Sequence, residues 1–191
     1  IMKTIPAKGA SVKQLHVELF PAPVELACPN GVTGALCDRK ISLIDLAGRT
    51  NNASALEAAG ISALCGQNPF KPVASLTSTC DKVITGNFNV IAAAPHMHLL
   101  GRTLKLTLNP GTPKEQLLLN VTNYNFDDQS AKILKTPVKV STGDTIRVEC
   151  TFDPTLRQKL PALKNLPPRY ITWGEGSSDE MCLGVIAATK D

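Results

Sequence analysis

The chain has 191 residues, of which 43% are hydrophobic and 19% are charged, with a formal net charge of +4. This composition is typical of a folded chain rather than a disordered one, and the length suits one domain with a full core. The lysines are scattered and only eight residues are aromatic, so we expect no nucleic-acid partner. No apolar run approaches about 18 residues, so we expect no membrane span.

The first predicted strand covers residues 12–20. Leu15, Val17 and Leu19 alternate with polar residues along it, and such alternation is typical of a strand with one buried face. We therefore expect these apolar residues to face the core. His16 belongs to the polar set and is expected at the surface, outside any metal site.

A small helical insertion is expected at about residues 38–65. Asp38 suits an N-cap position, and residues 53–64 are rich in alanine, a strong helix former. Gly48 and the asparagine pair that follows it interrupt the run. The pattern therefore predicts two short helices joined by a turn.

The chain has six cysteines and no Cys-x-x-Cys motif, which indicates disulfides and hence a secreted or periplasmic location. Because two helices joined by a turn bring their outer ends together, the helical insertion favours a Cys37–Cys65 bond. That choice leaves Cys28 to pair with Cys80. Pairing Cys28 with Cys37, and Cys65 with Cys80, is nearly as well supported and stays open.

A histidine pair follows the next predicted strand. The apolar run that begins at Asn89 reads as a buried strand, which would deliver His96 and His98 into the interior. Gly101 allows a bend, and residues 103–108 alternate as a second strand, so we expect the histidines in or beside a β-hairpin. Side chains two residues apart on a strand share a face, so the two imidazoles form half of a metal site.

Turn signals separate further short strands up to about residue 148, spaced roughly every eight to twelve residues. The predicted strands cover residues 117–121, 138–140 and 146–148. This pattern predicts an all-β fold, a jelly-roll-like β-sandwich with a small helical insertion, as one domain over residues 1–191.

Sulfur donors appear near the end of the chain, at Met181 and Cys182. Imidazole together with a thioether favours copper, above all Cu(I), over calcium or magnesium. Either Met181 or Cys182 could add a sulfur ligand to the two histidines, so the sequence predicts a copper site that includes His96 and His98.

These motifs resemble the C-terminal domain of the copper type II, ascorbate-dependent monooxygenases, the group of peptidylglycine hydroxylating and dopamine β-monooxygenases. The resemblance rests on His96-x-His98-x-x-Gly101, the 137–144 strand and turn, Cys150 and the block Asp179-Glu180-Met181-Cys182. It covers roughly residues 80–188, and the segment 28–75 looks like the form found in bacterial relatives.

The resemblance implies that His96, His98 and Met181 hold one copper that cycles between Cu(I) and Cu(II) and activates dioxygen. It also implies a second copper, held by three histidines of an N-terminal domain, with ascorbate as the external reductant. Only His16 remains outside the pair. The chain is therefore expected to be half of an enzyme, inactive in hydroxylation by itself.

The resemblance further bears on the substrate. Family members that amidate peptides grip the substrate carboxylate through an arginine, an asparagine and a tyrosine, and the matching positions here are Ala94, Leu183 and Val185. None of these side chains forms a charge-assisted hydrogen bond. Peptide amidation is thus not expected, and the substrate, a small molecule or a peptide, stays open.

The resemblance also implies a Cys150–Cys182 disulfide, which would fix Met181 beside a neighbouring strand. Asp179 and Glu180 are expected either to orient the copper ligands or to cap a tight turn. Two other functions stay open: a non-catalytic secreted copper carrier, and a structural sandwich whose His-x-His pair binds no metal.

Overall fold

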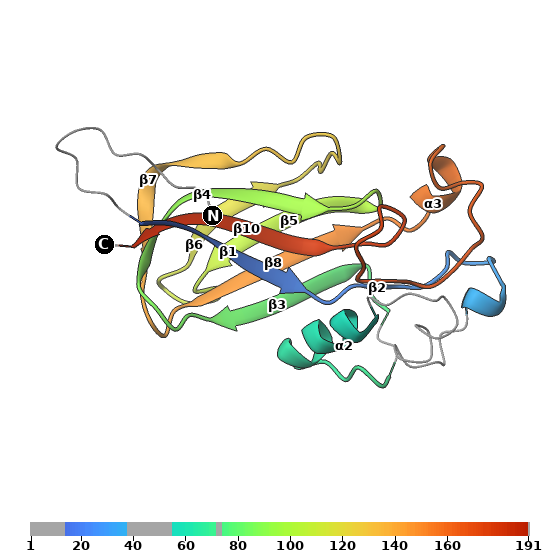
Figure 1. The fold of residues 1–191 in the computed structure, drawn as a ribbon, viewed down its shortest axis with the longest axis horizontal. Coiled ribbons are helices and arrows are strands. Elements are labelled where there is room, and N and C mark those ends of the chain that lie inside the picture. The colour runs from blue at the N-terminus through green and yellow to red at the C-terminus, as the bar shows by residue number, and fades with distance from the viewer. Residues whose placement is uncertain (1–13, 38–54, 72–73, 191) are drawn as a thin grey trace.

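Two antiparallel four-stranded sheets pack face to face in the computed structural model, which describes residues 14–37, 55–71 and 74–190 (Figure 1). The first sheet has the order β1 (Gln14–Ala22), β10 (Cys182–Lys190), β4 (Phe88–Met97), β7 (Lys132–Val140). The second has the order β3 (Thr77–Val83), β8 (Thr145–Phe152), β5 (Gly101–Leu108), β6 (Gln116–Val121). The predicted all-β sandwich is confirmed.

The remaining elements are short. They are the β2 (Glu25–Leu26) and β9 (Ile171–Thr172) pair, the 3-10 helix η1 (Ala35–Cys37) and the helices α2 (Ala55–Leu64) and α3 (Leu156–Lys159). Helix α2 confirms the second of the two predicted helices, and the first, at residues 38–54, lies outside the described part of the chain. Among the described residues, no helix is long and apolar enough to cross a membrane.

The core lies between the two sheets, and strand β10 shows how the sequence builds it. Its even-numbered residues from Cys182 to Ala188 are buried, while the odd-numbered ones are half-buried on the outer face. Gly184 leaves room for a side chain of the opposing sheet, because a Cβ there would come within 2.4 Å of Leu106 Cδ2. Strict alternation along β10 therefore determines which residues can reach a site on the outer face.

The prediction for strand β1 was wrong about which face is buried. Phe20 and Ala22 are buried in the core, whereas Val17 and Leu19 are 55% and 50% exposed. His16 lies on the same face as Phe20, and its ring packs edge-on against Phe88, with centroids 5.5 Å apart. Because side chains alternate, burial of the large Phe20 ring places His16 inside and turns the smaller aliphatic residues outward.

The predicted hairpin around the histidines was also wrong. Strands β4 and β5 belong to different sheets, and residues 98–100 carry the chain from one sheet to the other. Each strand has one apolar face, and two such faces cover each other only when the strands lie in opposing layers. Gly101 provides space at this crossing, because a Cβ there would lie 2.8 Å from the Met97 Cβ.

Three disulfides join Cys28 to Cys37, Cys65 to Cys80 and Cys150 to Cys182. The favoured Cys37–Cys65 and Cys28–Cys80 pairing was therefore wrong, and the alternative is correct. Helix α2 buries Ala58 and Ile61 in the core together with Cys80. Its C-terminal end thus carries Cys65 to strand β3 rather than back to Cys37. The Cys150–Cys182 bond links the two sheets, as the family resemblance implied.

Candidate metal centre

His96, His98 and Met181 lie at one end of the first sheet. His96 belongs to β4, His98 follows that strand's last residue, and their rings are 5.3 Å apart between centroids. Met97 between them and its pairing partner Cys182 in β10 are both fully buried. Alternation directs His96 to the other, outer face of the sheet, and His98 and Met181 come directly after and directly before the paired residues Met97 and Cys182.

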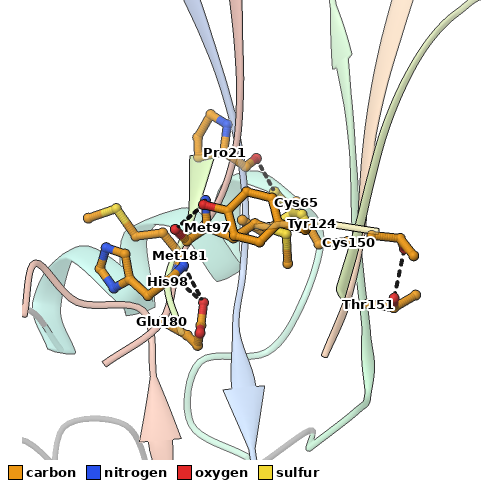
Figure 2. The surroundings of a disulfide bond; sticks show 11 residues. Pro21, Cys65, Met97, His98, Tyr124, Cys150, Thr151, Glu180 and Met181 are labelled. Atoms are coloured by element: carbon orange, nitrogen blue, oxygen red, sulfur yellow. Dashed lines mark hydrogen bonds between the residues drawn. A yellow bond between two sulfur atoms is a disulfide. The ribbon is translucent and has the colours of Figure 1, made fainter. Parts of the chain in front are cut away.

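The Glu180 carboxylate connects the backbone segments that carry His98 and Met181. Its side chain is completely buried, and its Oε2 atom accepts hydrogen bonds from the backbone N–H groups of His98 at 2.9 Å and Met181 at 3.1 Å. Its Oε1 atom accepts from Leu100 N at 2.6 Å. Figure 2 shows the carboxylate beside His98. Burial raises the pKa of Glu180 to about 7, although these N–H donors act in the opposite direction.

Both histidines donate their Nδ1 protons to fixed acceptors. His96 Nδ1 lies 2.6 Å from Gln129 Oε1, and Gln129 Nε2 donates to the Phe126 carbonyl, which identifies Oε1 as the acceptor. His98 Nδ1 lies 3.3 Å from the Asp179 carbonyl oxygen. A carbonyl only accepts, so each neutral ring carries its proton on Nδ1 and keeps the Nε2 lone pair free. This tautomer is the one needed to bind a metal through Nε2.

Electrostatics favour the neutral form of the His98 ring. Burial is the main cause that lowers the pKa of His98, and the neighbouring His96 lowers it further. A neutral imidazole is the metal-binding form. The nitrogen donor of His98 is therefore available without first losing a proton at neutral pH.

Tyr124 stabilises the backbone between the two histidines. Its hydroxyl donates to the Met97 carbonyl at 2.5 Å and accepts from Met97 N at 3.0 Å (Figure 2). Burial raises the pKa of Tyr124 to about 12. Sequence reasoning missed Tyr124 and Gln129, because neither belongs to a motif and both reach the site from a segment about thirty residues away in the chain.

The predicted capping of a tight turn is confirmed for Glu180, and a role of the two residues in orienting copper ligands stays a prediction. Glu180 caps the turn at residues 98–100, and the Asp179 backbone orients the His98 ring. The Asp179 carboxylate points to a different partner and forms an ion pair with Arg169. A pocket of about 220 Å³ opens beside His98, lined in part by Arg102, Tyr124 and Phe126.

The remaining histidine takes no part in this arrangement. His16 contacts Phe88, at the opposite end of β4 from His96, roughly 26 Å away along the strand. Both of its ring nitrogens are buried and without a hydrogen-bond partner among the described residues. Within that part of the chain, no group of three His, Cys, Asp or Glu side chains is placed to hold a metal. The candidate set of donors thus depends on the Met181 thioether.

Comparison with known proteins agrees with this geometry. Residues 66–187 match the family model described as "Copper type II ascorbate-dependent monooxygenase, C-terminal domain". No curated protein matches the chain. The matched region contains both histidines, Gln129, Glu180 and Met181, and it spans most of the two sheets. The chain belongs to the copper type II ascorbate-dependent monooxygenase family, of which it carries the C-terminal domain.

Proposed function

We propose that His96, His98 and Met181 bind one copper ion and that the chain is the dioxygen-activating half of a two-copper monooxygenase. The observation that supports this most strongly is the orientation of the two imidazoles. Their Nδ1 atoms are held by Gln129 and Asp179, which leaves the lone pair of each neutral ring on Nε2, and Met181 directly precedes Cys182, the pairing partner of Met97. A thioether beside two imidazoles fits Cu(I), the oxidation state that reduces dioxygen.

The residues around the donors hold them in place before an ion arrives. Glu180 joins the backbones of His98 and Met181 through one oxygen atom, and the Cys150–Cys182 bond anchors the residue after Met181. The three disulfides support a secreted or periplasmic location, where copper and oxidised thiols occur together.

The second copper of the family requires another domain. The 191 residues contain one histidine besides the pair, and it is half-buried, with its ring against Phe88. We therefore propose an N-terminal copper domain as the partner, with ascorbate as the electron source for the complete enzyme. A copper carrier that retains only this site is the alternative.

The substrate of this centre is not a peptide carboxylate. Strand register places Leu183 opposite His96 and Val185 opposite Ala94. The three positions that bind the substrate carboxylate in peptide-amidating family members therefore lie on the same face as His96. All three side chains are aliphatic, and none donates a hydrogen bond. A substrate bound there would meet apolar contacts rather than a charged clamp.

Copper titration tests the proposed site. The protein should bind one Cu(I), and X-ray absorption should show nitrogen ligands and one sulfur ligand. The His96→Ala/His98→Ala variant should lose this binding. Met181→Ile should weaken Cu(I) by about tenfold or more and Cu(II) less, because it removes a soft donor. Unchanged tight binding in the double variant would refute the assignment.

Gln129→Ala provides a second test. We expect copper affinity to fall by roughly ten- to a hundredfold, because the acceptor that holds the His96 tautomer is removed. Competition titration against a chromophoric chelator measures the change. Gln158→Ala, on the exposed side of α3, is the matched control and should leave the affinity unchanged.

Measuring oxygen incorporation into a substrate distinguishes the half-enzyme proposal from the copper-carrier alternative. The copper-loaded chain with ascorbate should consume dioxygen slowly and release peroxide, without hydroxylating amines or glycine-extended peptides. Addition of a partner domain that supplies the second copper should start hydroxylation. Stoichiometric hydroxylated product from this chain alone would contradict the half-enzyme proposal.

A further inference from the structure

Three cationic side chains line a small pocket apart from the histidines. Its volume is about 170 Å³, and its lining includes Arg157, Lys164 and Arg169 but no acidic residue. A water molecule takes about 30 Å³ of liquid volume, so the pocket has room for a larger polar group. Arg157 comes from helix α3, and the other two cations lie between α3 and β9.

Arg157 is a buried guanidinium with only neutral acceptors. Its residue is 5% exposed. Its Nη1 and Nη2 atoms donate to the carbonyl oxygens of Ser178 at 3.3 Å and Pro167 at 3.1 Å. Its Nε atom is buried and has no hydrogen-bond partner among the described residues. A buried charge without an opposite charge in direct contact is costly.

The nearest carboxylate is already engaged. Asp179 forms its ion pair with Arg169, and the Arg169 bonds to Ser178 and Asp179 all use Nη2, which leaves other donors of that side chain available. One carboxylate therefore serves two guanidinium groups, and the pocket lining adds a lysine. Burial and then the neighbouring Arg169 lower the pKa of Arg157, and Asp179 acts in the opposite direction with a smaller effect.

We propose that this pocket binds a small oxyanion, a phosphate or a carboxylate, through Arg157, Arg169 and Lys164. Guanidinium groups present paired N–H donors that match the oxygens of either anion, and Lys164 adds a mobile charge from the exposed rim. The loop that carries Ser178 and Asp179 separates this site from the proposed copper ligands. The proposal is independent of the proposed copper function.

Calorimetric titration of the metal-free full chain, with chelator present, tests the site. Inorganic phosphate and succinate are the two probes, each at constant ionic strength against chloride. We expect saturable binding of one anion per chain. The probe that binds more tightly identifies whether the site prefers a phosphate or a carboxylate. The side-chain Nε–H resonances of Arg157 and Arg169 should shift in parallel with the heat. If titration with phosphate and with succinate released no more heat than titration with chloride, the proposal would be overturned.

Variants at the partly buried Arg169 and the exposed Lys164 keep the test informative if changes at the buried Arg157 prevent folding. Arg169→Gln should weaken the better anion roughly tenfold or more, because it removes a charged donor, and Lys164→Gln should weaken it severalfold. Lys159→Gln is the control: it removes the same charge from α3, where Lys159 donates to Thr155 and is not among the residues that line the pocket. Equal weakening by Lys164→Gln and Lys159→Gln would show general screening and refute a defined site.

Discussion

Replacing Glu180 with leucine should lower the free energy of unfolding by at least about 3 kcal/mol. The leucine leaves the backbone N–H groups of His98, Leu100 and Met181 buried without an acceptor, and each such group costs about 1–3 kcal/mol. Glu180→Gln keeps one acceptor oxygen and should cost less than leucine but remain clearly destabilising. Urea denaturation at neutral pH measures both variants.

Glu175 provides the control for this experiment. It lies in the same loop but is exposed, so Glu175→Leu and Glu175→Gln should change the free energy of unfolding by less than about 0.5 kcal/mol. The expected order of stability is wild type, glutamine variant, leucine variant. A Glu180→Leu protein as stable as its Glu175 counterpart would show that the carboxylate does not hold the turn.

Removing the Cys150–Cys182 disulfide should cost about 4 kcal/mol. The bond closes a loop of 32 residues, and the chain-entropy account gives about that value for this length. Both cysteines are completely buried, so a change of both to alanine avoids placing polar hydroxyls in the core. We further expect weaker Cu(I) binding, because the residue beside Met181 is no longer tied to the second sheet.

The matched comparison is the Cys28–Cys37 bond, which closes only 9 residues. Its removal should cost about 2.5 kcal/mol by the same account and leave copper binding unchanged, since it lies outside the residues around His98. Denaturation of the two double variants without reductant measures the difference. If the shorter loop cost as much as the longer one, the entropic reasoning would fail.

The strands were predictable because alternation and turn residues are local signals. Residues 117–121 and 146–148, for instance, fall within β6 and β8. The buried face of β1 was not predictable from Leu15, Val17 and Leu19, because burial of Phe20 depends on the glycine opposite it in β10. That pairing joins residues far apart in the chain, and no local pattern reports it.

For the candidate site, the proposed donors could be named from the sequence and their supports could not. His96 and His98 form a motif, and Met181 follows an acidic pair. Gln129 looks like any polar loop residue, and only the folded chain shows that its amide oxygen meets His96 Nδ1. The disulfides failed for a similar reason, because the position of Cys65 depends on how α2 packs against the sheets.

The buried carboxylate of Glu180 also has a thermodynamic consequence. It holds the turn at residues 98–100 and the start of β10 together in the metal-free protein, so an ion taken up between His98 and Met181 would order little additional chain. Zinc fingers, by contrast, fold only when their metal binds. The heat-capacity change of copper uptake should therefore be close to zero, because almost no apolar surface leaves water, and uptake should proceed in a single kinetic phase.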